Sequence, residues 1–123
     1  MKKVGNQEAN VDELVERFNA IALEQFDANW KLQTARYNRL YEKMAEIRAE
    51  LKSRNGDQRR ALIPLLESGN IQVRLMAANT LLAIAPDRAR KALESVRDYG
   101  QLPQAADASM MLDALENGSF IPS

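Results

Sequence analysis

Apolar residues recur every three or four positions along most of the chain, the spacing that places them on one face of an α-helix. The first such stripe consists of Val11, Leu14, Val15, Phe18, Ile21, Ala22 and Phe26. Asn10 and Glu13 stand at its start with the spacing of a capping box, in which each side chain bonds the other residue's backbone N–H. We therefore predict a helix over 11–26, preceded by a polar, frayed segment over 1–9.

A second apolar stripe runs over residues 28–53 and predicts one long helix there. Its members are Trp30, Tyr37, Leu40, Met44, Ile47 and Leu51. At 1.5 Å per residue this helix would be about 39 Å long and the helix over 11–26 about 24 Å, so the shorter helix leaves part of the longer one uncovered. The uncovered part holds Met44, Ile47 and Leu51, which pack either on later helices or on a second copy of the chain in an antiparallel homodimer.

Glycines, prolines and one asparagine divide the rest of the chain into four shorter helices, which we predict over 58–68, 71–85, 86–98 and 103–116. Helix ends are expected at Gly56, Gly69, Gly100 and Gly118, and helix starts at Asn70, Pro86 and Pro103. Pro64 lies well inside the first of these helices and should kink it, because its ring displaces a backbone hydrogen bond. The helix over 71–85 is apolar almost all round, so we expect it to be the most buried element.

The apolar stripes together define the expected hydrophobic core. We predict that it consists of Leu14, Phe18, Trp30, Leu40, Met44, Leu62, Leu65, Leu66, Val73, Ala77, Leu81, Ile84, Leu93, Val96, Met111 and Leu112. The tail after the last helix contains two large apolar residues, Phe120 and Ile121, and we expect both to fold back onto this core.

The second half of the chain contains an internal repeat. When residues 61–84 are moved forward by 31 positions, they fall on residues 92–115, and the identical pairs are Ala61 with Ala92, Leu62 with Leu93, Gly69 with Gly100, Ala77 with Ala108 and Leu81 with Leu112. A unit of helix, glycine and helix with this period indicates an α-solenoid, in which each helix pair buries its apolar faces against a neighbouring pair.

Residues 61–85 resemble a short HEAT-type repeat, of the HEAT/armadillo-like kind found in compact bacterial proteins. The resemblance is carried by Pro64 within the first helix, by Asn70 at the turn and by the pair Val73 and Arg74 that opens the second helix. It implies a structural role in which the Arg74 side chain bonds Asn70. A functional Arg74 on a concave solenoid face is the alternative.

Residues 86–116 match the same motif weakly, and the chain as a whole is similar to a group of short bacterial proteins classed as a domain of unknown function. The expected fold is all-α, a HEAT-like α-α superhelix of about six helices in one domain over 1–123. A long N-terminal helical hairpin would pack on two shorter helix pairs. From the N-terminus, the expected segments are the frayed end, the hairpin, the HEAT-like pair, a degenerate HEAT-like pair and the tail, over 1–9, 10–57, 58–85, 86–117 and 118–123.

Composition narrows the functional classes. Hydrophobic residues make up 46% and charged residues 28% of the chain, which is the balance of an ordinary globular domain. Lys plus Arg and Asp plus Glu number 17 each, and a net charge of zero argues against a dedicated polyanion binder. The chain has no Cys and no His, which excludes zinc fingers, disulfide frameworks and catalysis by either residue type. We therefore expect no catalytic residue, no metal and no cofactor.

The basic residues are concentrated in one region, residues 28–60, which contains nine of them against four acidic residues. As a candidate interaction face we select Arg36, Arg39, Lys43, Arg59 and Arg60. Trp30, Tyr37 and Tyr41 add aromatic side chains, and nucleic-acid grooves combine the two kinds. Trp30 and Tyr37 also belong to the apolar stripe, however, so three interpretations stay open: a solvated surface, a contact for an anionic protein partner, or a nucleic-acid site.

The N-terminal residues Met1, Lys2 and Lys3 are followed by polar residues rather than by the apolar segment of a signal peptide, so we expect a cytoplasmic protein with no membrane contact. The leading hypothesis is a small non-enzymatic interaction or adaptor module that binds a protein partner or itself, for instance as the neutralising partner of a bacterial effector. Nucleic-acid binding by the basic face is the alternative. A HEAT-type enzyme is a second alternative, and it requires an exposed Trp30 that shares a groove with a carboxylate.

Overall fold

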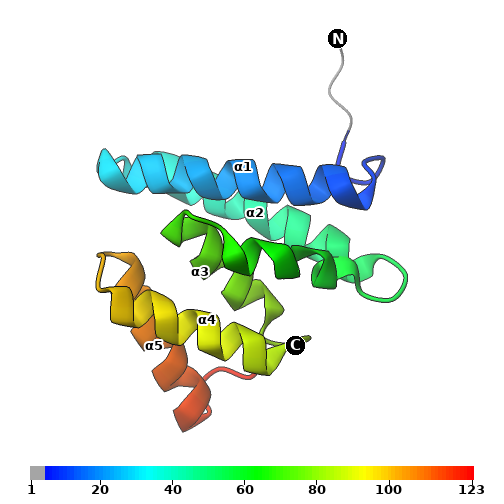
Figure 1. The fold of residues 1–123 in the computed structure, drawn as a ribbon. Coiled ribbons are helices and arrows are strands. Elements are labelled where there is room, and N and C mark those ends of the chain that lie inside the picture. The colour runs from blue at the N-terminus through cyan, green and yellow to red at the C-terminus, as the bar shows by residue number, and fades with distance from the viewer. Residues whose placement is uncertain (1–4) are drawn as a thin grey trace. The chain divides into compact units, whose positions relative to one another are not determined.

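The computed structural model describes residues 5–123, and within this range it contains helices and no β-strand (Figure 1). The elements are α1 (Val11–Trp30), α2 (Thr34–Ser53), the 3₁₀-helix η1 (Gln58–Glu67), α3 (Ile71–Leu81), α4 (Pro86–Tyr99) and α5 (Gln104–Asn117). The predicted all-α class with six helices is confirmed. The chain forms two compact units, unit 1 (Met1–Ala61) and unit 2 (Leu62–Ser123).

Unit 1 is a hairpin of α1 and α2, which pack against each other along their lengths (Figure 1). The predicted capping box at the start of α1 is present. The backbone N–H of Glu13 donates to Asn10 Oδ1 at 2.8 Å, and the backbone N–H of Asn10 donates to Glu13 Oε1 at 3.4 Å. The core between the two helices is apolar, and Leu14, Phe18 and Leu40 are buried in it.

The two hairpin helices have equal lengths, which corrects the predicted boundaries. Each has 20 residues and is about 30 Å long, because α1 continues to Trp30 and α2 begins only at Thr34. The predicted overhang of the second helix is therefore wrong, and its three apolar residues, Met44, Ile47 and Leu51, are buried in this chain. Homodimerisation through α2 stays a prediction, and it would have to use other residues of that helix.

Trp30 is the largest error in the predicted core, since 78% of it is exposed. It is the last residue of α1 and is separated from α2 by a turn, so its spacing of seven from Tyr37 does not place the two side chains on one helix face. The stripe over 28–53 combined residues of two different helices.

Unit 2 is built around α3, as its composition predicted. Nine of the eleven residues of α3 are buried, and the helix packs against both α4 and α5. Asn70 caps it as expected, with its Oδ1 accepting from the N–H groups of Gln72 at 2.9 Å and Val73 at 3.2 Å. The side chain of Gln104 on α5 donates to Gln72 Oε1 at 2.9 Å, so a buried amide pair joins these two helices.

The segment that contains Pro64 departs from its prediction. It is a 3₁₀-helix over Gln58–Glu67 with Pro64 inside it, rather than a kinked α-helix. Proline lacks a backbone N–H and its ring clashes with the carbonyl four residues earlier, so the tighter winding avoids the conflict that a kink would otherwise relieve. The two halves of the 31-residue repeat thus differ, because a 3₁₀-helix precedes α3 whereas two α-helices form the second pair.

Other helix ends agree with the sequence patterns. Gly100 and Gly118 follow α4 and α5 in the left-handed conformation, with φ values of 81° and 79°. Pro86 is the first residue of α4, while Pro103 stands one position before α5. Gly69 separates η1 from α3 without adopting a positive φ.

The rest of the predicted core is largely correct. Besides Trp30, the predicted core residues that are not fully buried are half-buried: Leu65, Leu66, Ile84, Met111 and Leu112. The expectation for the tail is wrong for Ile121, which is 80% exposed, while Phe120 is 40% exposed. Among residues 5–123, no helix is long and apolar enough to cross a membrane.

Candidate functional site

The five predicted basic residues do not form one face. Arg36, Arg39 and Lys43 are spaced by three and four positions on α2 and therefore share a side of that helix. Arg59 and Arg60 belong to η1, which follows α2 in the chain. The last residue of α2, Ser53, lies about 25 Å along the helix axis from Arg36. The structure brings three of these residues together and leaves the other two at the opposite end of the hairpin.

Arg36 is held by carboxylates of α1. Its Nη1 donates to Asp27 Oδ2 at 2.7 Å, and its Nη2 lies 3.6 Å from Glu24 Oε1. Lys31 Nζ lies 3.1 Å from the same oxygen of Asp27. The hydrogen bond from Arg36, followed by that from Lys31, lowers the pKa of Asp27 below its usual range. The charge of Arg36 is therefore compensated within the hairpin.

Arg59 and Arg60 organise the turn between α2 and η1. The Arg59 guanidinium donates to both carboxylate oxygens of Asp57, at 2.9 and 2.7 Å, and this interaction lowers the pKa of Asp57. Arg60 Nη2 donates to the carbonyl oxygen of Gly56 at 2.6 Å. Asp57 has a left-handed backbone (φ 53°), a conformation that a short polar side chain tolerates better than most. Both arginines thus have local structural partners.

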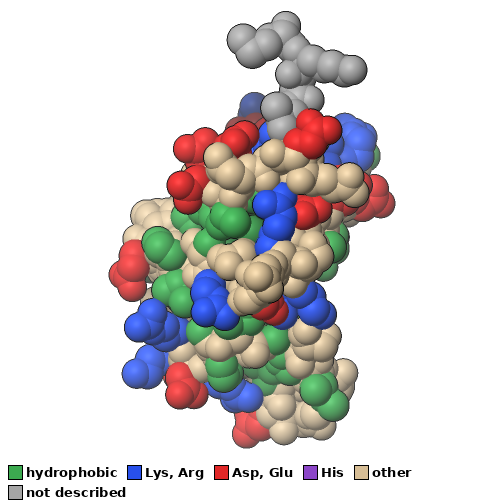
Figure 2. Space-filling view, turned by 90° about the vertical axis from the view of Figure 1, so that its right-hand side faces the viewer, with side chains coloured by type: hydrophobic (Ala, Val, Ile, Leu, Met, Phe, Trp, Pro, Cys, Tyr) green, Lys and Arg blue, Asp and Glu red, His purple; other side chains and the backbone are tan. Residues whose placement is uncertain are grey.

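Arg39 and Lys43 are exposed, and no described residue forms an ion pair with either. Lys43 borders a groove of about 490 Å³ between α1 and α2, together with Arg17, Glu24 and Glu46. The charged residues of this groove are balanced in sign. On the face shown in Figure 2, basic and acidic side chains also lie among one another, so neither sign is confined to one area.

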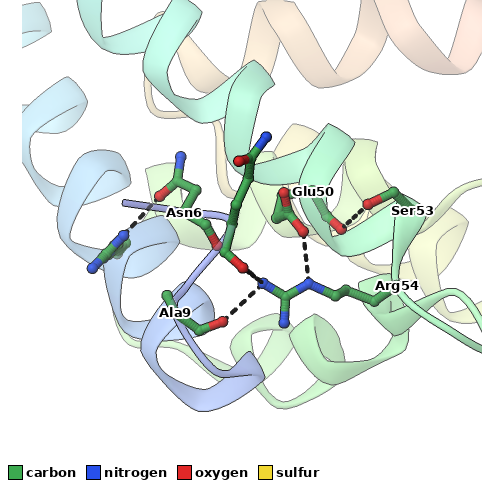
Figure 3. A network of polar contacts seen from close by, with 7 residues as sticks. Asn6, Ala9, Glu50, Ser53 and Arg54 are labelled. Atoms are coloured by element: carbon green, nitrogen blue, oxygen red, sulfur yellow. Dashed lines mark hydrogen bonds and ion pairs between the residues drawn. The ribbon is translucent and has the colours of Figure 1, made fainter. Parts of the chain in front are cut away.

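A polar network around Arg54 was not predicted (Figure 3). Its Nε donates to Glu50 Oε2 at 2.6 Å, and its Nη2 donates to the backbone carbonyls of Asn6 at 3.0 Å and Ala9 at 2.8 Å. The sequence spacing of Glu50 and Arg54 indicated only an ordinary surface pair, because the carbonyl partners lie more than forty positions away in the sequence.

The Arg54 network corrects the expectation of a frayed N-terminus. Residues 5–9 form a turn in which the N–H groups of Glu8 and Ala9 both donate to the Gly5 carbonyl, and Ala9 is buried. The Asn6 side chain accepts a further hydrogen bond from Arg17 Nη1 at 2.8 Å. Residues 1–4 of the predicted frayed segment lie outside the described residues.

Three exposed apolar residues lie at the end of α1 and in the turn that follows it, and we call them the hairpin-tip patch: Leu23, Trp30 and Leu32. Leu32 is 87% exposed and has a left-handed backbone with φ 57°. Leu23 is also exposed and stands seven positions before Trp30, so both lie on the same side of α1. The sequence signal that could have revealed this patch is the lack of any continuation of the stripe beyond Trp30 within four residues.

The predicted bond between Arg74 and Asn70 is absent. Asn70 Oδ1 is occupied by the two backbone N–H groups that it caps, so it is not available to a side chain four residues on. Arg74 Nε is buried without a hydrogen-bond partner among the described residues. Pro64 and Asn70 both have the local structural roles that their helix positions require, at the centre of η1 and before α3.

Among residues 5–123, no group of three acidic side chains is close enough to hold a metal ion. Glu42, Glu46 and Glu50 follow one another along α2, but Glu50 is bonded to Arg54 and faces the N-terminal turn.

Comparison with known proteins shows which family and which solved structure this chain resembles. The model of a family described as a domain of unknown function (DUF2019) matches residues 12–116. Among solved structures, the crystal structure of the protein RPA1889 from Rhodopseudomonas palustris CGA009 is similar, with 46% sequence identity and a TM-score of 0.94. The match covers 98% of this chain and 100% of that chain. No curated protein matches this sequence.

Proposed function

The chain belongs to the DUF2019 family, and from this premise we propose that it is a protein-interaction module that binds a partner protein through the hairpin-tip patch. The observation that carries the proposal is the exposure of Trp30 and Leu32 in one turn, at 78% and 87%. Tryptophan is enriched among the residues that dominate binding energy at protein interfaces, because its large ring excludes water over a wide area.

The backbone of the tip supports this interpretation. A leucine in the left-handed conformation costs about 1–2 kcal/mol relative to an ordinary backbone. Burial of the Leu32 side chain does not offset this cost, because the residue is exposed. The turn is nevertheless well defined, since the N–H of Gln33 donates to the Ala28 carbonyl at 2.9 Å. Stability alone would favour glycine or asparagine at position 32, so we take contact with a partner as the reason for leucine.

Charged residues close to the patch in the sequence support the proposal as well. Asp27 and Lys31, which stand on either side of Trp30 in the sequence, form an ion pair, and Arg36 of α2 pairs with the same carboxylate. Interfaces commonly have an apolar centre surrounded by polar groups that keep water away from it. The partner surface should therefore contain an apolar pocket, with charges of both signs at its margin.

The finer description of the module is also a proposal. A HEAT-like α-α superhelix is supported by the 31-residue repeat, by the Asn70 cap and by the packing of α3 on both following helices. HEAT repeats serve as scaffolds and adaptors, which fits a cytoplasmic neutralising partner of a bacterial effector.

The proposal is tested with the full chain and its captured partner. Trp30 is the only tryptophan, so its fluorescence reports on its own surroundings. In the free chain we expect the red-shifted emission of an exposed indole, and a blue shift when the partner is added. Trp30→Ala should weaken binding by about thirtyfold or more, as substitution of a central interface residue typically does.

Matched control variants lie in unit 2. Tyr99 and Leu102 are 67% and 72% exposed, so Tyr99→Ala and Leu102→Ala remove comparable apolar surface from another place. Both should leave binding unchanged, whereas Leu32→Ala should weaken it. An emission maximum that does not move at saturating partner, or equal losses in all these variants, would reject the hairpin-tip patch as the contact.

Nucleic-acid binding remains the alternative, and one observation favours it. Arg39 and Lys43 are free of ion pairs to described residues, and both Trp30 and Tyr41 are exposed on the same hairpin. Such binding requires an affinity for single-stranded nucleic acid that falls steeply with salt and that Arg39→Gln with Lys43→Gln abolishes. Absence of binding at low salt would end this alternative.

A HEAT-type enzyme remains the second alternative. Trp30 is exposed, as this hypothesis requires. Asp27, one turn earlier on α1, is the carboxylate that could share its surroundings, but it is ion-paired with Arg36 and Lys31. Those partners favour its charged form and occupy its oxygens, so the interaction hypothesis needs fewer rearrangements than the catalytic one.

A further inference from the structure

Unit 2 contains a groove of about 340 Å³ that no sequence pattern indicated. It is lined by the residues just after α3, the first turns of α4, the end of α5 and the tail that follows. Figure 1 shows this tail returning from α5 toward the start of α4. Its side chains are apolar apart from that of Arg90, and polar backbone groups are exposed between them; the main residues are Leu82, Pro86, Arg90, Leu115, Phe120 and Ile121.

The tail is held in place by its backbone, so the groove is part of the fold. Gly118 reverses the chain after α5 with φ 79°, and the N–H of Phe120 then donates to the Ala114 carbonyl at 3.2 Å. This anchor places Phe120 and Ile121 along the groove although neither is buried. Two large apolar side chains are thus fixed in contact with solvent beside an apolar groove.

Arg90 is the one cation of this groove, and it lacks an internal counter-charge. It is exposed on α4, and no residue in the described range 5–123 forms a hydrogen bond or ion pair with it. Glu94 stands four positions later, the spacing of an intrahelical ion pair, yet the two side chains are not paired. The groove therefore combines apolar side chains with a cation, Arg90, that has no anionic partner among the described residues.

We propose that this groove binds a medium-chain fatty acid, with the carboxylate on Arg90 and the alkyl chain between Leu115 and Phe120. A guanidinium pairs with a carboxylate through two parallel hydrogen bonds, and the apolar lining complements a chain of methylene groups. A peptide fits less well, because its amide groups need hydrogen-bond partners and Arg90 is the only lining side chain that offers donors.

The first test titrates the full chain with hexanoate, octanoate, decanoate and octanol below their micelle concentrations, followed by NMR amide shifts. We expect shifts at Leu82, Leu115 and Phe120, and an affinity that rises by up to about fourfold per added methylene until the groove is full. Octanol should bind at least about tenfold more weakly than octanoate, since it cannot form the charged pair with Arg90. Equal binding of octanol and octanoate would overturn the proposal.

A matched pair of variants tests the role of Arg90 itself. Arg88 is also exposed on α4, two positions away and therefore on another side of the helix, and it does not line the groove. Arg90→Gln should reduce octanoate binding to the level of octanol, whereas Arg88→Gln should leave it unchanged. Equal effects of the two substitutions would indicate attraction by net charge alone and would reject the site.

A third experiment distinguishes a fatty acid from the C-terminus of a protein, which also carries a terminal carboxylate. A short peptide with a C-terminal leucine presents the same apolar group and charge, together with amide groups. We expect octanoate to bind the groove more tightly than this peptide, and to displace the peptide if the peptide binds there. If the peptide binds more tightly than octanoate and loses affinity in Arg90→Gln, the groove is a site for a protein C-terminus and the fatty-acid proposal is wrong.

Discussion

The two units of the chain place their polar side chains in different ways. In unit 1, Arg36, Arg54 and Arg59 each bond a carboxylate, and Arg54 also bonds two backbone carbonyls of the N-terminal turn. Unit 2 is organised by burial instead, since most of α3 is inaccessible to solvent and its helices share a buried amide pair. Unit 1 therefore adds specific polar contacts at its ends to its apolar core, whereas unit 2 is centred on one buried helix.

This difference changes how charge should be interpreted in the sequence. Residues 28–60 are rich in basic residues, but several of these are occupied in holding the hairpin together. Unit 2 has no such excess, yet Arg90 stands without a partner among the described residues beside an apolar groove. Which cations are uncompensated is therefore decided by their neighbours in the fold and not by a local surplus of charge in the sequence.

The largest expected effect tests the packed character of unit 2. Leu81→Ala in α3 removes a fully buried side chain and should lower the free energy of unfolding by about 3 kcal/mol. Leu23→Ala, at an exposed position of α1, should cost less than about 0.5 kcal/mol. Urea unfolding followed by circular dichroism measures both, and similar losses would contradict the close packing of α3.

The next effect tests the polar network of unit 1. Arg54→Met keeps the alkyl stem but removes the bonds to Glu50 and to the Asn6 and Ala9 carbonyls, and should cost about 1–2 kcal/mol. Amide hydrogen exchange of Ala9 should accelerate, because its turn loses the anchor. Lys52→Met, an exposed change two positions earlier near the end of α2, should alter neither quantity.

The two asparagine caps allow a direct comparison between the units. Asn10→Ala removes an exposed capping box, and Asn70→Ala removes a half-buried cap that accepts two backbone hydrogen bonds. We expect a loss of about 0.5–1 kcal/mol for Asn10→Ala and about 1–2 kcal/mol for Asn70→Ala, because buried amides left unpaired cost more. Thermal unfolding of both variants would show the order, and the reverse order would count against the burial argument.

The smallest expected effect is a change in how the folding stability depends on pH under acidic conditions. The ion pair with Arg59 lowers the pKa of Asp57, so its contribution to stability is present above the ordinary pKa and is lost as the pH falls through the lowered value. Partial burial raises the pKa of Asp107 on α5, so protonation of that group favours the folded state.

Two variants separate these opposite signs. Asp57→Asn should flatten the loss of stability between pH 7 and pH 3, while Asp107→Asn should steepen it, each by less than about 1 kcal/mol. Asparagine also tolerates the left-handed backbone at position 57, so the substitution isolates the charge. Urea midpoints across this pH range provide the measurement, and changes of the same sign in both variants would refute the assignment.

Much of the fold could be predicted because it depends on local interactions. The starts of α1 and α3 follow from Asn10 and Asn70, whose side chains bond N–H groups two or three positions later. The ends at Gly100 and Gly118 follow from the left-handed conformation that glycine adopts without strain. The boundary between α1 and α2 was misplaced because Leu32 adopts that conformation without being glycine.

The candidate site was predicted less well, for a reason visible in individual residues. The expected bond of Arg74 to Asn70 was lost to backbone groups that compete for the same oxygen. Arg36 was selected as a free cation but meets Asp27, nine positions earlier and on the other helix of the hairpin. Which charges remain available depends on neighbours that the helical spacing does not show.

The sequence by itself determined that this chain is helical, where most helices begin and end, and that α3 is the most buried of them. These properties follow from contacts within about four positions and from the count of apolar faces on one helix. Only the tertiary structure decided that Trp30 faces solvent, that Arg54 anchors the N-terminal turn and that Arg90 borders an apolar groove. Each of these depends on where a helix ends relative to residues distant in the sequence, and periodicity along one helix carries no information about that distance.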